Sequence, residues 1–220
     1  MMIKNSNSKL ICTTIPSQFR TKHNSRKIDT ITIHTMAGNM SIESCGKLFQ
    51  KKGKNASSNY GIGTDGRIAL YVDEKDASWC SSNTPNDERA ITIEVANDGN
   101  ANTGWHISDE AMLALISLLS DVCERNEIKR LLWKNDKSLI GKVKEQNMTV
   151  HRWFANKSCP GDYLMSKMDY IVNAVNYNLE KVFPDKLYRV QVGAFSKKEN
   201  AIKLQKKLLN IGIESIIKES

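Results

Sequence analysis

The stretch from Ile28 to His34, IDTITIH, alternates apolar and polar side chains, which is typical of a strand with one buried face. Successive side chains of a strand point to opposite faces, so we expect Ile31 and Ile33 to face the core. His34 then falls on the opposite face, at the end of the strand. The pattern therefore predicts a sheet with a functional side chain on its second face.

A second run, Ala90 to Val95 with the sequence AITIEV, repeats this pattern. Its apolar side chains share one face and leave Glu94 on the other. If both runs are strands of one sheet, Glu94 and His34 project from the same surface.

The stretch HRWFANKSCPG, residues 151–161, places an imidazole and a thiol eight positions apart. Pro160 and Gly161 follow Cys159 directly and predict a turn that holds the sulfur at the end of a loop. A histidine and a cysteine displayed in this way are either a nucleophile pair or two ligands of a tetrahedral zinc ion. Zinc needs a third protein ligand, and His34 is the best candidate among the four histidines.

Three protein ligands would leave the fourth position of zinc open, as a catalytic site requires. A carboxylate that lies near this position without binding the metal is a natural general base, and Glu94 fits that description.

Four motifs together resemble the zinc-dependent N-acetylmuramoyl-L-alanine amidases, the group that includes phage lysozyme-type amidases and peptidoglycan recognition proteins. They occur in the family's order, and the resemblance covers roughly residues 25–178. The motifs are IHTMAGN (33–39), ASSNYGIGTDGRI (56–68), ITIEVAND (91–98) and HRWFANKSCPG (151–161).

The resemblance implies an α/β fold with a central mixed β-sheet flanked by helices. It also implies a peptidoglycan hydrolase that cleaves the amide bond between the lactyl group of N-acetylmuramic acid and L-alanine of the stem peptide. In that family pattern, His34, His151 and Cys159 hold Zn²⁺ and Glu94 transfers protons. Lys157, two residues before the last ligand, faces the oxyanion of the tetrahedral intermediate.

The resemblance further suggests three substrate-binding residues, Asn59, Tyr60 and Trp79. Phage relatives carry a catalytic tyrosine just before the strand expected here at residues 60–62, but Ser58 occupies its place in this sequence. This departure leaves the acid–base role to Glu94.

Two other functions compete with the amidase. A non-catalytic peptidoglycan-binding protein would keep the fold and typically lose the cysteine ligand, whereas Cys159 is present. A cysteine peptidase would use Cys159 and His151 and would leave His34 and Glu94 without a role.

Helical and hairpin patterns connect these motifs. We expect a helix from Ser41 to about Lys52, a hairpin of residues 60–62 and 67–72, a helix that begins after Ser108 and covers one face of the sheet, and a helix from about Asp162 to Asn178.

The chain is expected to divide into a catalytic domain (1–178), a linker (179–186) and a C-terminal segment (187–220). YRVQVGAFSKKENA, residues 188–201, resembles the start of the sporulation-related (SPOR) repeat, which binds glycan strands in its family. The alternation predicts strands at 187–195 and 211–217 around a helix at 197–210. So small a unit would dock on the catalytic domain, pair with a second copy in a homodimer, or remain partly disordered.

The net charge of +8 and the isoelectric point near 9.2 favour a polyanionic partner. Nucleic acid is one candidate, but we find no nucleic-acid-binding signature and no membrane span. Anionic wall polymers explain the charge equally well, and so does a solvated basic surface with no dedicated partner. Five cysteines and no export signal in the first residues favour reduced thiols. The resemblance to amidases implies a phage endolysin or a bacterial autolysin. Without a readable export signal, such a lysin is expected to stay in the cytoplasm until release to the wall, through a holin in the phage case.

Overall fold

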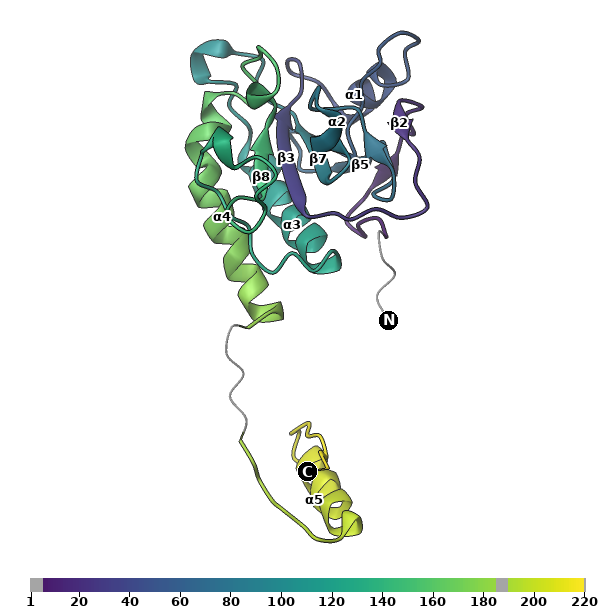
Figure 1. Cartoon of the computed structure of the whole chain (residues 1–220), viewed down its shortest axis with the longest axis vertical. Coiled ribbons are helices and arrows are strands. Elements are labelled where there is room, and N and C mark those ends of the chain that lie inside the picture. Colours follow the sequence, from purple (N-terminus) through teal and green to yellow (C-terminus); the bar gives the residue numbers. More distant parts are fainter. Residues whose placement is uncertain (1–5, 185–189, 220) are drawn as a thin grey trace. The chain divides into compact units, whose positions relative to one another are not determined.

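Two six-residue strands, β3 (Thr30–Thr35) and β7 (Ala90–Val95), form where the sequence predicts strands, and they lie side by side in one sheet (Figure 1). The computed structural model describes residues 6–184 and 190–219. The other strands are β1 (Thr13–Thr14), β2 (Arg20–Thr21), β4 (Tyr60–Ile62), β5 (Ile68–Leu70), β6 (Ala77–Ser78) and β8 (Met148–Val150). The helices are α1 (Ile42–Leu48), α2 (Thr84–Asp87), α3 (Asp109–Arg125), α4 (Asp162–Val182) and α5 (Lys198–Asn210), with short 3-10 helices at Ala101–Thr103, Lys137–Leu139 and His151–Trp153.

The main sheet has the strand order β1-β5-β4-β7-β3-β8. β3 runs parallel to both of its neighbours, β7 and β8. β4 and β5 form the predicted hairpin and pair antiparallel, with Ile62 opposite Ile68. The expected mixed sheet flanked by helices is therefore confirmed.

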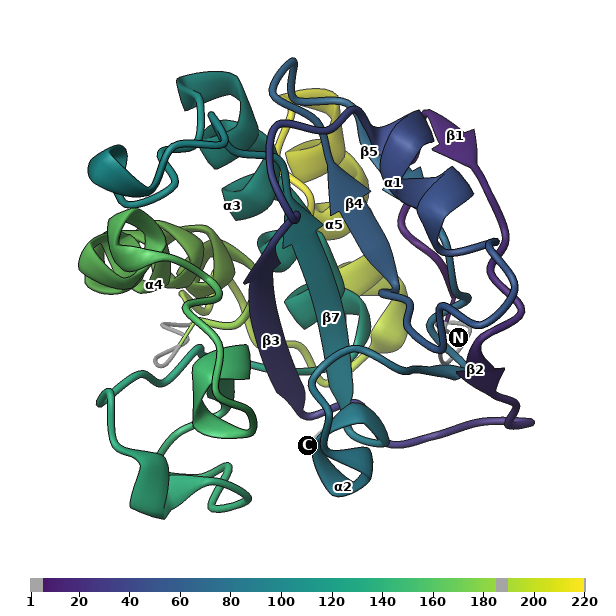
Figure 2. The same ribbon diagram turned by 90° about the horizontal axis from the view of Figure 1, so that it is seen from above.

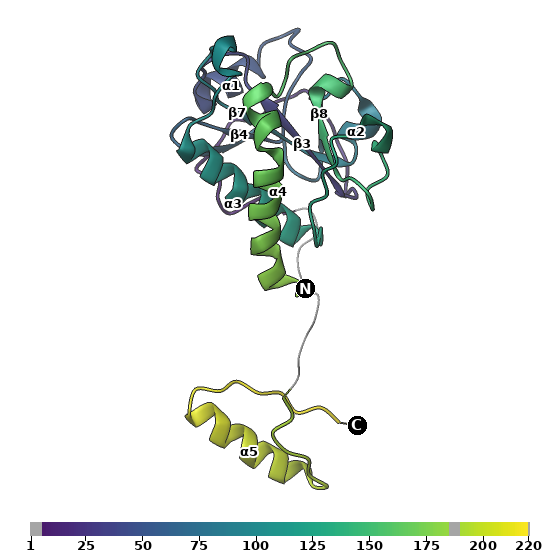
Figure 3. The same ribbon diagram turned by 90° about the vertical axis from the view of Figure 1, so that its left-hand side faces the viewer.

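One face of the sheet carries the apolar side chains of β3 and β7 and is covered by α3 and α4. Figure 2 shows α3 behind the strands, and Figure 3 shows α4 beside it. Ile31, Ile33, Ile91 and Ile93 have no exposed surface. Burying each such side chain stabilises the fold by roughly 1.5–3 kcal/mol, so the two strands are held firmly.

The opposite face of the sheet is polar and also buried. Asn86 of α2 donates to the Thr32 hydroxyl (3.0 Å) and accepts from the Thr149 hydroxyl (2.9 Å). The two threonine hydroxyls lie 2.8 Å apart. This cluster, the Asn86 cluster, joins β3 to β8 below the strand ends that carry the predicted site.

The predicted helices form, but two of them end elsewhere. α1 begins after its cap Ser41 as expected and stops at Leu48, because residues 50–54 (QKKGK) offer no apolar side chain for a further turn to bury. α4 continues to Val182, past the predicted end at Asn178, because Leu179 extends its buried stripe. Residues 179–182 of the expected linker are therefore helical.

The chain divides into two compact units between Pro184 and Asp185. In the second unit, α5 confirms the predicted helix. Within the described residues the predicted strands are wrong, because 190–197 and 213–219 pair with no other strand. Residues 187–189 of the first predicted strand lie outside the described residues. Alternation fixes which side chains share a face but supplies no partner strand. Val190 and Ile216 accordingly remain 87% and 86% exposed.

Among the helices in the described ranges, none has the length and apolar composition needed to cross a membrane.

Candidate metal centre

His34 and Glu94 are register partners on the parallel strands β3 and β7. Partners in register point to the same face, so the strands bring the imidazole and the carboxylate together, as the alternating patterns predict. His34 is fully buried. Its position is therefore fixed by a sheet whose other face is the hydrophobic core.

His151 and Cys159 reach the same point from the edge of the sheet. His151 follows directly on β8, the neighbour of β3, and opens a short 3-10 helix. The backbone N–H of Arg152 donates to the carbonyl of Cys159 (3.0 Å), which folds the intervening loop back on itself. Gly161 has φ = 88°, a left-handed conformation that favours glycine. The loop therefore returns the thiol to the imidazoles.

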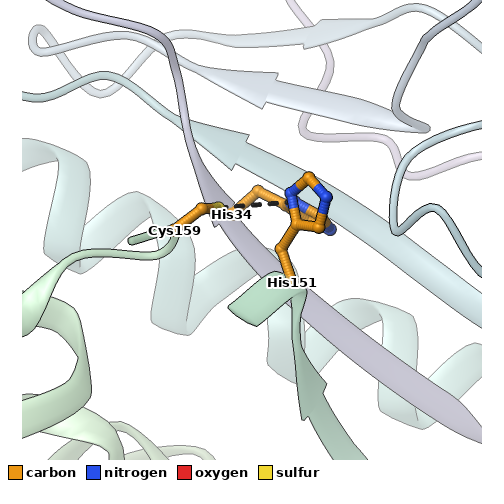
Figure 4. A group of neighbouring side chains, drawn as sticks. All are labelled: His34, His151 and Cys159. Atoms are coloured by element: carbon orange, nitrogen blue, oxygen red, sulfur yellow. Dashed lines mark hydrogen bonds between the residues drawn. The ribbon is translucent and has the colours of Figure 1, made fainter. Parts of the chain in front are cut away.

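The side chains of His34, His151 and Cys159 converge (Figure 4). Cys159 Sγ lies 3.5 Å from His34 Nδ1, and the two imidazole centroids are 4.9 Å apart. One ligand atom from each residue lies within 4.8 Å of the other two. Zinc bonds are about 2.0–2.3 Å long, so the close spacing of these three atoms supports a shared ion.

The protonation states of the three side chains suit metal binding. Burial, aided by the charge of His151, lowers the pKa of His34 to about 3, so this imidazole is neutral at physiological pH. Burial and the nearby Lys157 ammonium lower the pKa of His151. Burial, with the Glu94 charge, raises the pKa of Cys159 to about 12, so the thiol must lose its proton to solvent when a metal binds. Two neutral imidazoles and a thiol that can ionise are a fitting donor set for a divalent cation.

Glu94 stands beside the three ligands without a strong partner of its own. Its Oε1 lies 3.9 Å from Cys80 Sγ, and its Oε2 is buried with no hydrogen-bond partner. Burial raises the pKa of Glu94 to about 8. A carboxyl that titrates near neutrality can both accept and deliver a proton.

Lys157 is exposed on the loop between His151 and Cys159. Its charge acts on the His151 imidazole, so the ammonium lies near this candidate ligand.

Two of the three predicted substrate-binding residues are corrected. Asn59 and Tyr60 are fully buried, since both serve the interior of the sheet. The side-chain Oδ1 of Asn59 accepts from the Thr92 backbone N–H (3.1 Å), and the Tyr60 hydroxyl donates to the Glu74 carboxylate (2.6 Å). Neither side chain can reach a substrate.

Trp79 remains available to a ligand. This residue is 42% exposed, and its ring packs against Phe19 with centroids 5.9 Å apart. Its role in substrate binding stays a prediction.

The sequence patterns missed Cys80, which they treat only as one of the reduced thiols. Burial, together with the Glu94 charge, raises its pKa well above the usual range. Its approach to Glu94 depends on the path of the loop between β6 and α2, which carries no local signal.

Two family models match different parts of the chain. The family model described as N-acetylmuramoyl-L-alanine amidase matches residues 24–162, and the SPOR domain model matches residues 184–220. None of the curated proteins compared with the chain matches its sequence.

Several solved structures resemble the fold. A selenomethionine AmpD derivative has a TM-score of 0.53 and 16% identity, covering 78% of this chain and 99% of that chain. PlyL has a TM-score of 0.50 and 13% identity, covering 69% and 85%. The endolysin amidase LysCS from Clostridium intestinale URNW has a TM-score of 0.47 and 16% identity, covering 74% and 97%.

Proposed function

We propose, from the premise that the chain belongs to the N-acetylmuramoyl-L-alanine amidase family, that His34, His151 and Cys159 hold the zinc ion of a peptidoglycan hydrolase. The family model covers residues 24–162, and this family assignment makes the chain an amidase that acts on the cell wall. The observation that carries the zinc assignment is the convergence of one nitrogen or sulfur atom from each of the three residues within 4.8 Å.

The proposed substrate bond is the amide between the lactyl group of N-acetylmuramic acid and L-alanine. When bound, zinc supplies Lewis acidity at the scissile carbonyl and favours the ionisation of water. Glu94 takes the proton of the attacking water and later delivers it to the departing amine. Its unpartnered Oε2 and its pKa of about 8 support both steps.

Lys157 is proposed to donate to the oxyanion of the tetrahedral intermediate. Because that charge develops only during the reaction, the exposed ammonium would stabilise the transition state more than the bound substrate. Lys157→Ala should therefore lower kcat more than it raises KM. The reverse pattern would make Lys157 a substrate-binding residue.

Chelation tests the metal assignment. Dialysis against a strong chelator should abolish wall hydrolysis, and zinc should restore it. Mass spectrometry of the digested wall should find newly freed L-alanine amino termini. Full activity in the chelator would reject the zinc mechanism, and a different new terminus would reject the proposed bond.

Glu94→Gln tests the proton transfer. The amide keeps the size of the carboxyl but cannot accept the proton, so kcat should fall by about 10²–10⁴-fold while zinc content stays at one per chain. Glu110→Gln, an exposed acid in the first turn of α3, is the matched control. Near-normal turnover of Glu94→Gln would assign the base elsewhere.

The amidase and SPOR matches indicate that the chain binds peptidoglycan. We extend this to anionic wall polymers, attracted by the net charge of +8, and to a homodimer formed through the C-terminal unit. Sedimentation of the full chain with and without residues 185–220 tests the dimer; a monomer in both cases rejects it.

The proposed setting is a phage endolysin or bacterial autolysin that acts after release from the cytoplasm, through a holin in the phage case. Expression should lyse cells only when the inner membrane is permeabilised; lysis without permeabilisation contradicts this setting.

A further inference from the structure

Cys80 lies next to the metal centre, and the proposed amidase mechanism gives it no role. Its Sγ is 3.9 Å from Glu94 Oε1. The Asp87 carboxylate accepts from the backbone N–H groups of Cys80 (3.1 Å) and Ser81 (3.1 Å), which pins the loop in this position. The thiol is therefore held against the centre by the fold.

His34, Cys80 and Glu94 form a second group of potential ligands. One ligand atom from each lies within 4.8 Å of the other two. This group shares His34 with the first set but uses neither His151 nor Cys159.

Two atoms of this second group are buried and have no hydrogen-bond partner. They are Nε2 of His34, a residue with no exposed surface, and Oε2 of Glu94. Buried polar atoms are nearly always paired, so two orphans in one cluster call for an explanation. The other ring nitrogen of His34, Nδ1, lies 3.5 Å from Cys159 Sγ. The orphaned atoms are thus of the kind that a cation could satisfy.

We propose that His34, Cys80 and Glu94 form a second binding position for a thiophilic divalent cation such as Zn²⁺, Co²⁺ or Cd²⁺. The donors are an imidazole nitrogen, a thiolate sulfur and a carboxylate oxygen, a combination that suits these metals. Cys80 releases its thiol proton to solvent when the cation binds.

The two positions exclude each other. A neutral imidazole has a single nitrogen lone pair, so His34 serves one cation at a time. These two positions therefore hold one ion between them, either with His34, His151 and Cys159 or with His34, Cys80 and Glu94.

The second position is catalytically silent. A cation there takes Glu94 as a ligand, and the carboxylate is then no longer free to accept the proton of water. This consequence rests on the proposed function, whereas the binding itself does not.

Cobalt absorption tests the binding directly. Cys159→Ser removes the thiolate of the first set, so any thiolate-to-cobalt charge-transfer band in this variant must come from another cysteine. We expect the Cys159→Ser protein, loaded with one equivalent of Co²⁺, to keep such a band. The double variant Cys80→Ser/Cys159→Ser should lose it.

The controls separate this proposal from the amidase assignment. Circular dichroism checks that both variants fold. The double variant keeps the exposed Cys12, so it also controls for a band that comes from that cysteine. A folded Cys159→Ser protein without the band, or a double variant that retains it, overturns the proposal even if the wild type hydrolyses peptidoglycan. A band that depends on Cys80 in a protein without hydrolase activity would leave the second position standing and reject the proposed function.

Discussion

Replacing Asn86 by alanine tests whether the polar face of the sheet sets the spacing of the metal ligands. The Asn86 amide joins Thr32 to Thr149, and each threonine lies two residues before a histidine ligand, His34 or His151. The alanine variant leaves every proposed ligand in place. It should nevertheless weaken metal binding, because β3 and β8 lose the side chain that bridges them.

The magnitude follows from the bonds that disappear. Two hydrogen bonds of 3.0 and 2.9 Å are lost, each worth about 1 kcal/mol net. The two threonine hydroxyls keep their mutual 2.8 Å bond, so neither is left wholly unpaired. We expect the free energy of unfolding to fall by about 2–3 kcal/mol, which corresponds to a drop in Tm of roughly 5–10 °C for a domain of this size. Zinc affinity should fall by about tenfold, the lower range for residues that support ligands indirectly.

Urea unfolding of the metal-free protein and competition with a zinc-binding dye measure the two effects. Asn178→Ala is the matched control, since its amide donates to the Ser120 hydroxyl (3.1 Å) and links α4 to α3 on the opposite face of the sheet. The control should lose about 1 kcal/mol and keep its zinc affinity. If Asn86→Ala is destabilised with unchanged affinity, the bridge does not position the ligands. If its stability equals that of the wild type, the reasoning about the bonds fails as well.

Two further predictions concern the ligand loop and an ion pair. Gly161→Ala should destabilise the protein by about 2 kcal/mol or more and weaken zinc binding, because Gly161 has φ = 88° and a Cβ there would lie 2.7 Å from the Gly104 carbonyl oxygen. The control Gly141→Ala, at a position with φ = 82° and open space around the added Cβ, should lower stability without changing zinc affinity. Equal zinc affinities in the two variants would contradict the prediction. Burial acts to raise the pKa of Asp29, but the hydrogen bonds and charges of Arg89 and Lys27 together outweigh it and hold the pKa below its usual value. The ionised pair therefore stabilises the fold above about pH 4, and the contribution disappears as the pH falls through the lowered pKa. In urea unfolding, Arg89→Met should be less stable than the wild type at pH 6, with a difference that narrows towards pH 3; a constant difference would refute the linkage.

The strands of the site could be predicted from the sequence because alternation reports directly on the two faces of a strand. It placed His34 and Glu94 on one surface but could not show that they are register partners, since register depends on how β3 and β7 pair. The prediction that His151 and Cys159 converge on His34 rested on the resemblance of whole motifs to a known family. No local pattern connects side chains that lie 125 positions apart.

Other features depended on packing that the sequence does not display. Asparagine is usually a surface residue, but the side chain of Asn59 makes its hydrogen bonds inside the sheet, where its Oδ1 accepts from the Thr92 backbone N–H. Cys80 approaches Glu94 only because Asp87 fixes the loop before α2. The expected strands around α5 failed for the related reason that a strand requires a neighbour, which alternation cannot provide.

β8 is an edge strand of the main sheet, and this position makes it the part of the site that would separate first on heating. This three-residue strand is bonded on one side only, to β3, and His151 follows it directly. Peeling β8 away would separate His151 from His34 without disturbing the pairing of β3 with β7. Mild heating should therefore inactivate the protein before it melts, and backbone amides of β8 should exchange with deuterium sooner than those of β7.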